Sequence, residues 1–421
     1  MVINSSHMPG IPSDLRRVHR SHVLRNIFMS PRGSRTQLAA ETGLSAMAIT
    51  RIIRELIDAG LIEEVGKRNR QGNPGRRQTN LRVCASGAYV VGVVISAFGH
   101  EVALFSATGQ PLVRQPMSFE SIRTADEAID VVSSTIQSII NEAAIDSSRV
   151  LGIAIAIAAF VKTTTGTVTS APYLGWQEVE LGQRISERTN LPVNVENIAD
   201  AINMAEQAKG AAVAFDDVFL AHQSVTCGAS YSHGGQLVRG ANFSAGQIGH
   251  LPVSESSLVC SCGDTRCFNS HASGWSVLAN LDRIDSRRFE APNIESYALA
   301  LSRLVGENPK RDTPEGEALY HAGYQWGRTM QDVALIVDPQ AIVLAGKLSE
   351  ATAYVDGCES AWQDAPSKHG YKPPKLIVGQ VPAINAAGYL ALDTYLYSPQ
   401  LDIDGFLDSG TNTSDRRAGM R

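Results

Sequence analysis

Residues 249–267 read GHLPVSESSLVCSCGDTRC and hold three of the six cysteines of this 421-residue chain. The spacing H-x9-C-x-C-x4-C joins His250 to Cys260, Cys262 and Cys267. Thiolate and imidazole groups are the ligands that Zn²⁺ prefers, and four of them complete a tetrahedron. Because a closed ligand set leaves no position for an activated water, the pattern predicts a structural rather than a catalytic zinc ion.

The composition is that of an ordinary globular protein, with 43% hydrophobic and 19% charged residues. The length favours two or three domains. No run of about 18 apolar residues predicts a membrane span, and the N-terminus lacks the apolar core of a signal peptide. Six cysteines, half of them clustered, are too few for a disulfide scaffold. We therefore expect a cytoplasmic protein without a membrane association.

The net charge of −5 hides a division between two parts of the chain. Residues 1–83 hold 14 Lys and Arg against 6 Asp and Glu, a balance of +8. The remainder holds 23 against 36, a balance of −13. A basic N-terminal part joined to an acidic body indicates a polyanion-binding module attached to a second function.

The basic part has the pattern of a winged helix-turn-helix. Apolar residues recur at helical spacing in 19–28, and Ser34 and Ser45 are typical N-caps for helices over 34–43 and 45–60. Residues 61–83 then predict two strands around a basic, glycine-rich tip. The alternative that the pattern leaves open is a small helical protein-interaction domain with a basic loop.

The second helix of such a unit reads bases in the major groove, and the wing contacts phosphates or the minor groove. Its apolar stripe faces the core, which directs the opposite face toward double-stranded DNA. Small and methyl-bearing side chains suit thymine, whereas arginine suits guanine or phosphate. The predicted DNA contacts are Arg35, Ser45, Ala46, Met47, Thr50, Arg51, Arg54, Arg70, Arg76 and Arg77.

From residue 84 the pattern changes to strands alternating with helices. Two alternating strands over 88–112, an amphipathic helix over 125–144 and a buried strand over 150–161 predict an α/β body with a mixed sheet. The expected division is a disordered N-terminus (1–14), a winged helix (15–83), a body (84–397) and a disordered tail (398–421).

The combination of a winged helix, an α/β body and G-H-x9-C-x-C-G-x3-C resembles the ROK family of repressors and sugar kinases. Residues 15–397 resemble the regulator branch of the ROK family. The resemblance implies an actin-like, ribonuclease H-like sugar-kinase body of two lobes: one of about 84–195 plus 383–397, the other of about 196–382. It also implies a homodimer or dimer of dimers that binds operator DNA and responds to a sugar.

The resemblance also provides a test for kinase activity. The family's E-N-D-A-N becomes ENIAD (196–200), which places Ile198 where the family has its catalytic aspartate. Isoleucine cannot accept the proton of a sugar hydroxyl. The phosphate loops are altered as well, to ISAFGH (95–100) and SVTCGAS (224–230). We therefore expect no enzymatic activity; a sugar kinase with a fused DNA-binding unit is the disfavoured alternative.

The effector contacts that the resemblance implies are Asn197, Gln247, His250 and Asn269. Family members have acids at the positions of Ile198, Gln247 and Asn269. Two interpretations stay open: a modified sugar as ligand, or a lost site with a protein partner or none as regulator. We expect a modified sugar, because four polar residues remain. The predicted function is a repressor of carbohydrate-related genes; a body that only oligomerises is a further alternative.

Overall fold

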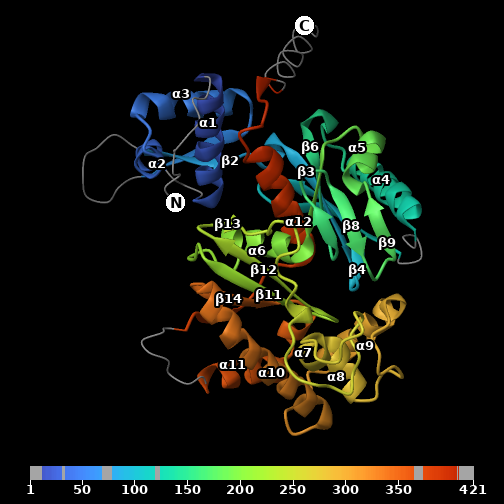
Figure 1. Cartoon of the computed structure of the whole chain (residues 1–421). Helices are drawn as coiled ribbons and strands as arrows, with labels where there is room; N and C mark the ends of the chain where they lie inside the picture. Colours follow the sequence, from blue (N-terminus) through green and yellow to red (C-terminus); the bar gives the residue numbers. More distant parts are fainter. Residues whose placement is uncertain are drawn as a thin grey trace.

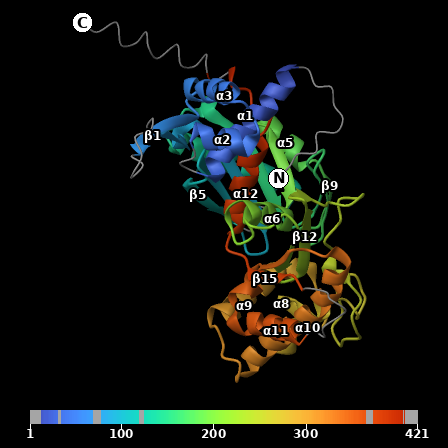
Figure 2. The same cartoon turned by 90° about the vertical axis from the view of Figure 1, so that its left-hand side faces the viewer.

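The computed structural model describes residues 12–30, 34–68, 78–118, 124–364, 373–404 and 406. Figure 1 shows a winged helix at the N-terminus and a body of two lobes, and Figure 2 shows the same arrangement from the side. In both views the winged helix lies against the first lobe, and the helical end of the second lobe lies farthest from it. No helix among the described residues is long and apolar enough to cross a membrane.

The N-terminal unit has the predicted helix and strand order. Ser34 and Ser45 cap the second and third helices by accepting hydrogen bonds from the N–H groups of Gln37 and Ala48. The stripe Ile49, Ile52, Ile53 and Leu56 is buried. The elements are α1 (Pro12–Met29), α2 (Arg35–Thr42), α3 (Ala46–Asp58), β1 (Ile62–Arg68) and β2 (Gln78–Val83), the strands pairing antiparallel.

Both predicted disordered ends are partly wrong. Helix α1 begins at Pro12, so residues 12–14 are helical. At the other end Leu401, Ile403 and Phe406 are buried, and Arg20 of α1 donates a hydrogen bond to the Leu401 carbonyl at 2.8 Å. The prediction of disorder rested on the polar composition of the tail. It overlooked three apolar side chains that pack against the winged helix and the body.

Lobe one is built on a five-stranded sheet in the order β10-β6-β3-β4-β5. Helices α4 (Ala125–Glu142) and α5 (Leu181–Thr189) pack on one face, and α12 (Ala383–Ala391) packs on the other. A small sheet of β7 (Phe160–Lys162), β8 (Thr167–Ala171) and β9 (Trp176–Val179) adjoins it. The main strands are β3 (Tyr89–Ser96), β4 (Gly99–Ser106), β5 (Pro111–Met117), β6 (Val150–Ile157) and β10 (Val193–Asn197).

Lobe two repeats this design with the sheet β13-β12-β11-β14-β15. Its strands are β11 (Val218–Gln223), β12 (Cys227–His233), β13 (Gln236–Leu237), β14 (Ala341–Ala345) and β15 (Lys375–Val378). Its helices are α7 (Asn269–Ala272), α8 (Gly274–Asn280), α9 (Ile294–Gly306), α10 (Pro314–Val337) and α11 (Thr352–Gln363).

The two sheets have the same topology. In each, the first three strands are antiparallel neighbours, the fourth pairs with the first in parallel, and the fifth pairs with the fourth in parallel. This repetition confirms the predicted actin-like, sugar-kinase-type body. Helix α6 (Ile198–Lys209) lies between the lobes and contacts α12, β11 and β12.

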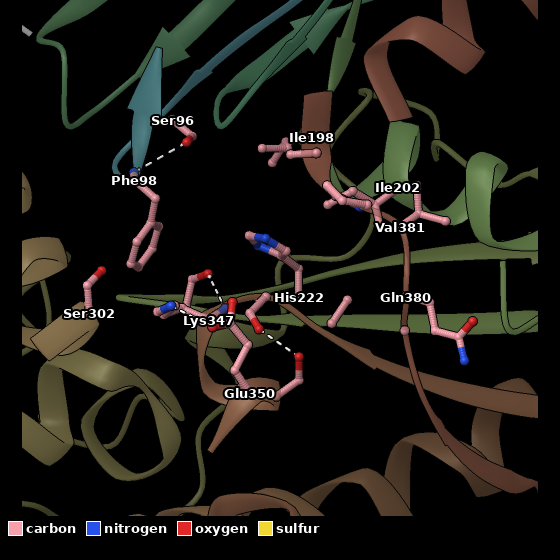
Figure 3. Close-up of a pocket in the computed structure, with 17 residues that line it drawn as sticks. Ser96, Phe98, Ile198, Ile202, His222, Ser302, Lys347, Glu350, Gln380 and Val381 are labelled. Atoms are coloured by element: carbon pink, nitrogen blue, oxygen red, sulfur yellow. Dashed lines mark hydrogen bonds and ion pairs between the residues drawn. The ribbon is translucent and has the colours of Figure 1, made fainter. Parts of the chain in front are cut away.

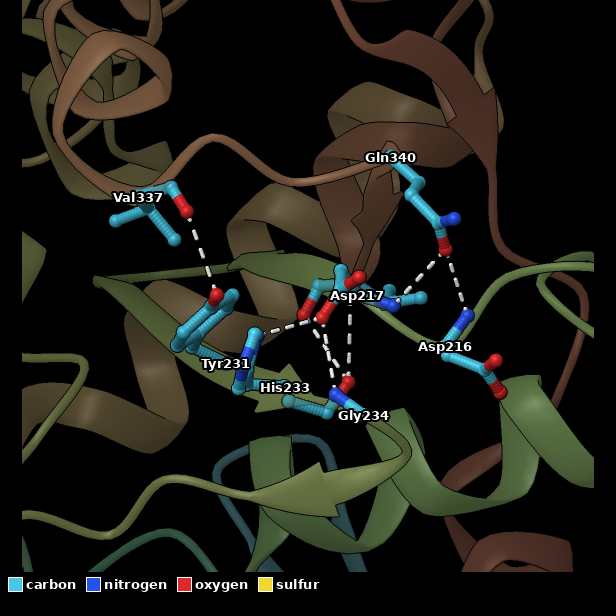
Figure 4. Close-up of polar contacts among 9 residues, drawn as sticks. Asp216, Asp217, Tyr231, His233, Gly234, Val337 and Gln340 are labelled. Atoms are coloured by element: carbon cyan, nitrogen blue, oxygen red, sulfur yellow. Dashed lines mark hydrogen bonds and ion pairs between the residues drawn. The ribbon is translucent and has the colours of Figure 1, made fainter. Parts of the chain in front are cut away.

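At the amino end of β11, polar side chains connect this strand to its neighbours in the sheet of lobe two (Figure 4). The Asp217 carboxylate lies 2.7 Å from Nδ1 of His233, and the Gln340 side-chain oxygen accepts hydrogen bonds from the N–H groups of Asp216 and Asp217. This edge is therefore tied to the start of β14. The carboxyl ends of β11 and β14 lie at the opposite edge, where ligands bind in open α/β sheets.

Candidate functional site

The exposed surface of α3 carries several of the residues predicted to contact DNA. Ala46, Met47, Thr50, Arg51 and Arg54 are exposed, opposite the buried isoleucine and leucine stripe. Met47 is 84% exposed, which is unusual for a large apolar side chain. The Ser45 hydroxyl is used by the helix cap. The geometry is that of a recognition helix with a small, apolar tip and two arginines behind it.

The arginines of this face have acidic partners within the winged helix. Arg51 Nε lies 3.3 Å from the Glu55 carboxylate, which also binds Arg16 at 2.5 Å. Arg54 pairs with Asp58 at 3.9 Å, and Arg35 pairs with Glu64 at 2.7 Å. The pairs of Arg54 and Arg35 are exposed on both sides, so each costs little to exchange for a phosphate, whereas the Glu55 side chain is only 15% exposed. The predicted wing residues Arg70, Arg76 and Arg77 lie outside the described residues.

The structure brings His250, Cys260, Cys262 and Cys267 together, with ligand atoms within 4.8 Å of one another. The His250 Nδ1 atom lies 3.7 Å from both Cys260 Sγ and Cys267 Sγ, and the Cys262 and Cys267 sulfurs are 3.3 Å apart. Zn–S bonds of about 2.3 Å place tetrahedral ligands about 3.5–3.8 Å apart. The donor set and its spacing therefore fit a zinc ion.

Two further features support this fit. Gly263 follows Cys262 with a φ of +93°, a conformation that L side chains rarely adopt, and this turn returns the chain toward Cys267. The hydrogen bond with Cys260 raises the pKa of His250 to about 9. Burial alone raises the pKa of the Cys260 thiol, but hydrogen bonds outweigh it and lower this pKa to about 6. Cys260 thus favours the thiolate, the form that binds metal. Burial raises the pKa of the Cys267 thiol, so this residue and the protonated His250 ring must each release a proton when they bind the metal.

One pocket, which we call the His250 pocket, is lined by His250, Asn197, Gln247 and Asn269 and has a volume of about 180 Å³. The four predicted effector residues therefore share one cavity. Since His250 Nδ1 faces the sulfurs, its Nε2 is the ring nitrogen left for a ligand. Aromatic and aliphatic side chains, among them Phe160, Phe289 and Ile294, complete the walls.

The two asparagines of the pocket are engaged within the protein. The Asn197 oxygen caps α6 at Ala199 N–H (2.8 Å), and its amide donates to the Ala159 carbonyl (2.8 Å). The Asn269 oxygen accepts from Cys227 N–H at 2.7 Å, and its amide nitrogen lies 3.9 Å from Cys260 Sγ. Gln247, in contrast, is exposed and makes no side-chain hydrogen bond to another described residue. It is the predicted contact with the most freedom to bind a ligand.

The kinase base position is apolar. Ile198 lines the His250 pocket, whereas Asp200 turns away and accepts a 2.5 Å hydrogen bond from Ser230. Burial, together with the nearby Glu196 carboxylate, raises the pKa of Asp200 to about 7. Glu196 is itself buried and pairs with Arg239 at 2.6 Å. Glu196 and Asp200 are thus held by contacts within the protein, and Ile198, at the predicted position of the kinase base, cannot accept a proton.

Sequence reasoning predicted no ligand contact in a second cavity beside this pocket, although it named two segments of its wall, 95–100 and 224–230, as altered phosphate loops; we call it the Phe98 cavity (Figure 3). It has a volume of about 480 Å³ and lies between Phe98 of lobe one and Ser302 and Lys347 of lobe two. His222 lines both cavities. A signal was present: His222 is a polar residue at the carboxyl end of an otherwise apolar strand, where ligand contacts concentrate.

The comparison with known families agrees with this architecture. The ROK family profile matches residues 90–379, and a winged helix-turn-helix DNA-binding profile matches residues 26–63. The first match spans more than half of the chain, so the chain belongs to the ROK family and carries a DNA-binding winged helix.

Several known proteins that are similar to this chain are regulators. The xylose repressor of Caldicellulosiruptor bescii is 23% identical over 340 residues, covering 80% of this chain and 84% of the relative. The DNA-binding transcriptional dual regulator NagC of Escherichia coli is 22% identical over 320 residues, covering 76% and 77%. The expected assignment to the regulator branch is confirmed by these matches together with the winged helix.

Solved structures show the same fold. A ROK family transcriptional regulator described as a homologue of the Escherichia coli MLC protein aligns with a TM-score of 0.75 and 22% identity, covering 94% of this chain and all of the other. A ROK family glucokinase from Streptomyces griseus, in complex with glucose and AMPPNP, aligns with a TM-score of 0.59 and 22% identity, covering 73% and 100%. The body therefore has a fold that both regulators and kinases use.

Proposed function

We propose that this protein is a sugar-responsive transcriptional repressor without kinase activity. The observation that carries the proposal is the coexistence of an exposed recognition helix with a kinase-like pocket whose base position is Ile198. The names of the relatives, a xylose repressor and NagC, support a carbohydrate-linked operator. The altered acids at Gln247 and Asn269 favour a modified sugar as the ligand.

The route from the pocket to the DNA-binding unit runs along α6. Asn197, at the pocket, is the N-cap of this helix, and Lys209 is its last residue. Lys209 Nζ donates a 2.9 Å hydrogen bond to the Phe28 carbonyl of α1 and lies 4.1 Å from the centre of the Phe28 ring. One rigid helix therefore connects the ligand site to the first helix of the winged unit.

A buried carboxylate ties the rest of the cleft to the same helix. Glu206 of α6 is fully buried and accepts hydrogen bonds from the N–H groups of Ala211 (2.7 Å), Gln380 (2.5 Å) and Val381 (2.7 Å). Gln380 and Val381 line the Phe98 cavity. A ligand that draws the lobes together would shift this segment and α6 as one unit, and with them α1.

Further contacts join α1 to the body, and a displacement of α6 and the 380–381 segment would alter them. Arg25 forms an ion pair with Asp393, and the Phe28 ring packs on Tyr397 with centroids 4.6 Å apart. In a homodimer or a dimer of dimers, displacement of α1 in each subunit changes the spacing of two recognition helices. Operator half-sites have a fixed spacing, so this displacement weakens binding.

The zinc ion in this proposal is structural. Held by His250, Cys260, Cys262 and Cys267, it would fix the loop that presents His250 Nε2 and Gln247 to the ligand. When bound, it supplies four strong ligand bonds and no reaction step, because the ligand set is closed. The Asn269 amide beside Cys260 Sγ would orient that sulfur.

A thermal-shift screen of the full-length protein against sugars and sugar derivatives tests the proposal. A selective ligand raises the melting temperature, because it binds only the folded state. Each hit is then incubated with ATP, and we expect no phosphorylated product. A body that only oligomerises predicts no hit in the screen, and turnover with ATP would assign the protein to the kinases instead.

A further inference from the structure

The His250 pocket and the Phe98 cavity are parts of one cleft, since Ile198 and His222 line both. Ligand pockets in proteins measure about 300–1,000 Å³. The His250 pocket, at about 180 Å³, falls below this range, whereas the Phe98 cavity, at about 480 Å³, falls within it. The larger part of the space available to a ligand therefore lies beyond the predicted effector contacts.

His222 stands where the two cavities meet and points into the Phe98 cavity (Figure 3). Burial lowers the pKa of His222 to about 4, so the ring is neutral at physiological pH. Among the described residues it has no hydrogen-bond partner. A neutral imidazole offers one donor and one acceptor, which matches the hydroxyl group of a ligand that passes between the cavities.

The walls of the Phe98 cavity combine an aromatic face with neutral polar groups. The Phe98 ring is 37% exposed and projects from lobe one toward lobe two. Opposite it, the Ser302 hydroxyl of α9 makes no hydrogen bond within the described residues. The two charged side chains of the lining, Lys347 and Glu350, neutralise each other at 2.5 Å. The cavity thus presents little net charge to a ligand.

These features suit a sugar ring better than a phosphate chain. A pyranose has hydroxyl groups around its edge and a face of C–H groups, and it pairs with polar side chains and an aromatic plate. A phosphate chain needs free cations and clustered backbone N–H groups. Here the lysine is already paired, and the segment 224–230 keeps a single glycine, Gly228.

We propose that the effector is an oligosaccharide or glycoside of at least two rings, with one ring in the His250 pocket and the next against Phe98. This inference rests on the proposed function, because it names the ligand class of the same cleft. The ring in the Phe98 cavity contacts Phe98 of lobe one and Ser302 of lobe two, so it bridges the lobes. A single ring in the His250 pocket lacks this bridge.

The test is isothermal titration calorimetry of the full-length protein with matched sugar pairs: xylose and xylobiose, glucose and cellobiose, N-acetylglucosamine and N,N′-diacetylchitobiose. In one of the series we expect the disaccharide to bind at least tenfold more tightly than the monosaccharide. Phe98→Ala should weaken disaccharide binding about tenfold and change monosaccharide binding less than twofold.

Two controls separate packing effects from ligand contact. Leu112→Ala removes a similarly exposed apolar side chain on β5, outside both cavities, and should leave both affinities unchanged. Ser302→Trp fills the Phe98 cavity from the opposite wall and should abolish the disaccharide preference. The melting temperature of each variant, measured without sugar, verifies that it folds.

The outcomes distinguish the inference from the proposed function. Equal affinity for the two sugars of every series that binds, or an equal effect of Phe98→Ala on both, would overturn the two-ring ligand and leave a monosaccharide sensor. AMPPNP that competes with the disaccharide would assign the Phe98 cavity to a nucleotide instead. Binding of no sugar of either length contradicts the two-ring ligand and the sugar sensor together.

Discussion

The metal cluster and the His250 pocket share one histidine but differ in what their polar side chains contact. In the metal cluster, four ligand atoms from residues 250–267 point at one another. In the pocket, Asn197 and Asn269 satisfy backbone groups of the protein, and Gln247 alone of the three amides is exposed and uncommitted. A metal site is defined by its donor atoms, whereas a sugar site also depends on which polar atoms the fold has left free.

The largest effect is expected at the metal cluster. Cys262→Ser removes one of four ligands, so the protein should lose its zinc and several kcal/mol of unfolding free energy, since metal binding is coupled to folding. Metal content by mass spectrometry and the melting temperature measure the two effects. Cys84→Ser is the matched control, because Cys84 is half-buried and lies outside the cluster. Full stability of Cys262→Ser without bound zinc would remove the structural role.

The recognition helix is, like the metal cluster, a local feature that needs no ligand to be tested. Arg51→Ala should weaken operator binding about tenfold or more, the cost of losing one arginine contact to DNA. Arg76→Ala, in the wing, should weaken binding by a similar factor and lower its salt dependence. Arg114→Ala, an exposed arginine of lobe one, should have no effect. Unchanged affinity in Arg51→Ala would contradict the assignment of α3 to the major groove.

A pair of pocket variants sharpens the comparison directly. Asn197→Ala removes the N-cap of α6 and the bond to Ala159, and should lower the unfolding free energy by about 1–2 kcal/mol. Gln247→Ala should leave stability within about 0.5 kcal/mol and weaken sugar binding about tenfold. Chemical denaturation and calorimetry measure the two quantities. If Asn197→Ala weakened sugar binding without loss of stability, and Gln247→Ala lowered stability without loss of binding, Asn197 would be the ligand contact and Gln247 the structural residue.

The last prediction concerns pH. The pKa of Asp200 is about 7 in the folded protein, mainly through burial, against 3.8 for an ordinary aspartate. The stabilising contribution of its proton is therefore fully present below about pH 4 and is lost as the pH rises through about 7. Asp200→Asn should flatten this loss when denaturation is followed between pH 4 and 8. It should leave sugar binding unchanged; altered binding would place Asp200 in the pocket.

The sequence predicted the local features well because each is set by short-range patterns. The caps at Ser34 and Ser45, the stripe from Ile49 to Leu56 and the spacing of the metal cluster all lie within single segments. The two-lobed, sugar-kinase-type body was predicted through family resemblance rather than periodicity. The packing of Leu401, Ile403 and Phe406 was missed because three apolar residues in a polar tail carry no periodic signal.

The cleft was predicted less completely because it is assembled from distant segments. Phe98, His222 and Ser302 lie on three elements of two lobes, and no spacing along the chain links them. The sequence also carried no sign that the Asn197 and Asn269 side chains would be occupied by backbone groups. Both facts depend on how the lobes pack and can be read only from the folded chain.

The most direct test of the central claim is the affinity of the full-length protein for its DNA with and without sugar. Fluorescence anisotropy on a duplex selected from a random pool gives the Kd, first alone and then with the tightest sugar from the screen. We expect the Kd to rise between about 5-fold and 150-fold, the usual range of coupling between two sites. An unchanged Kd at saturating sugar would contradict a repressor whose DNA binding is controlled through the cleft.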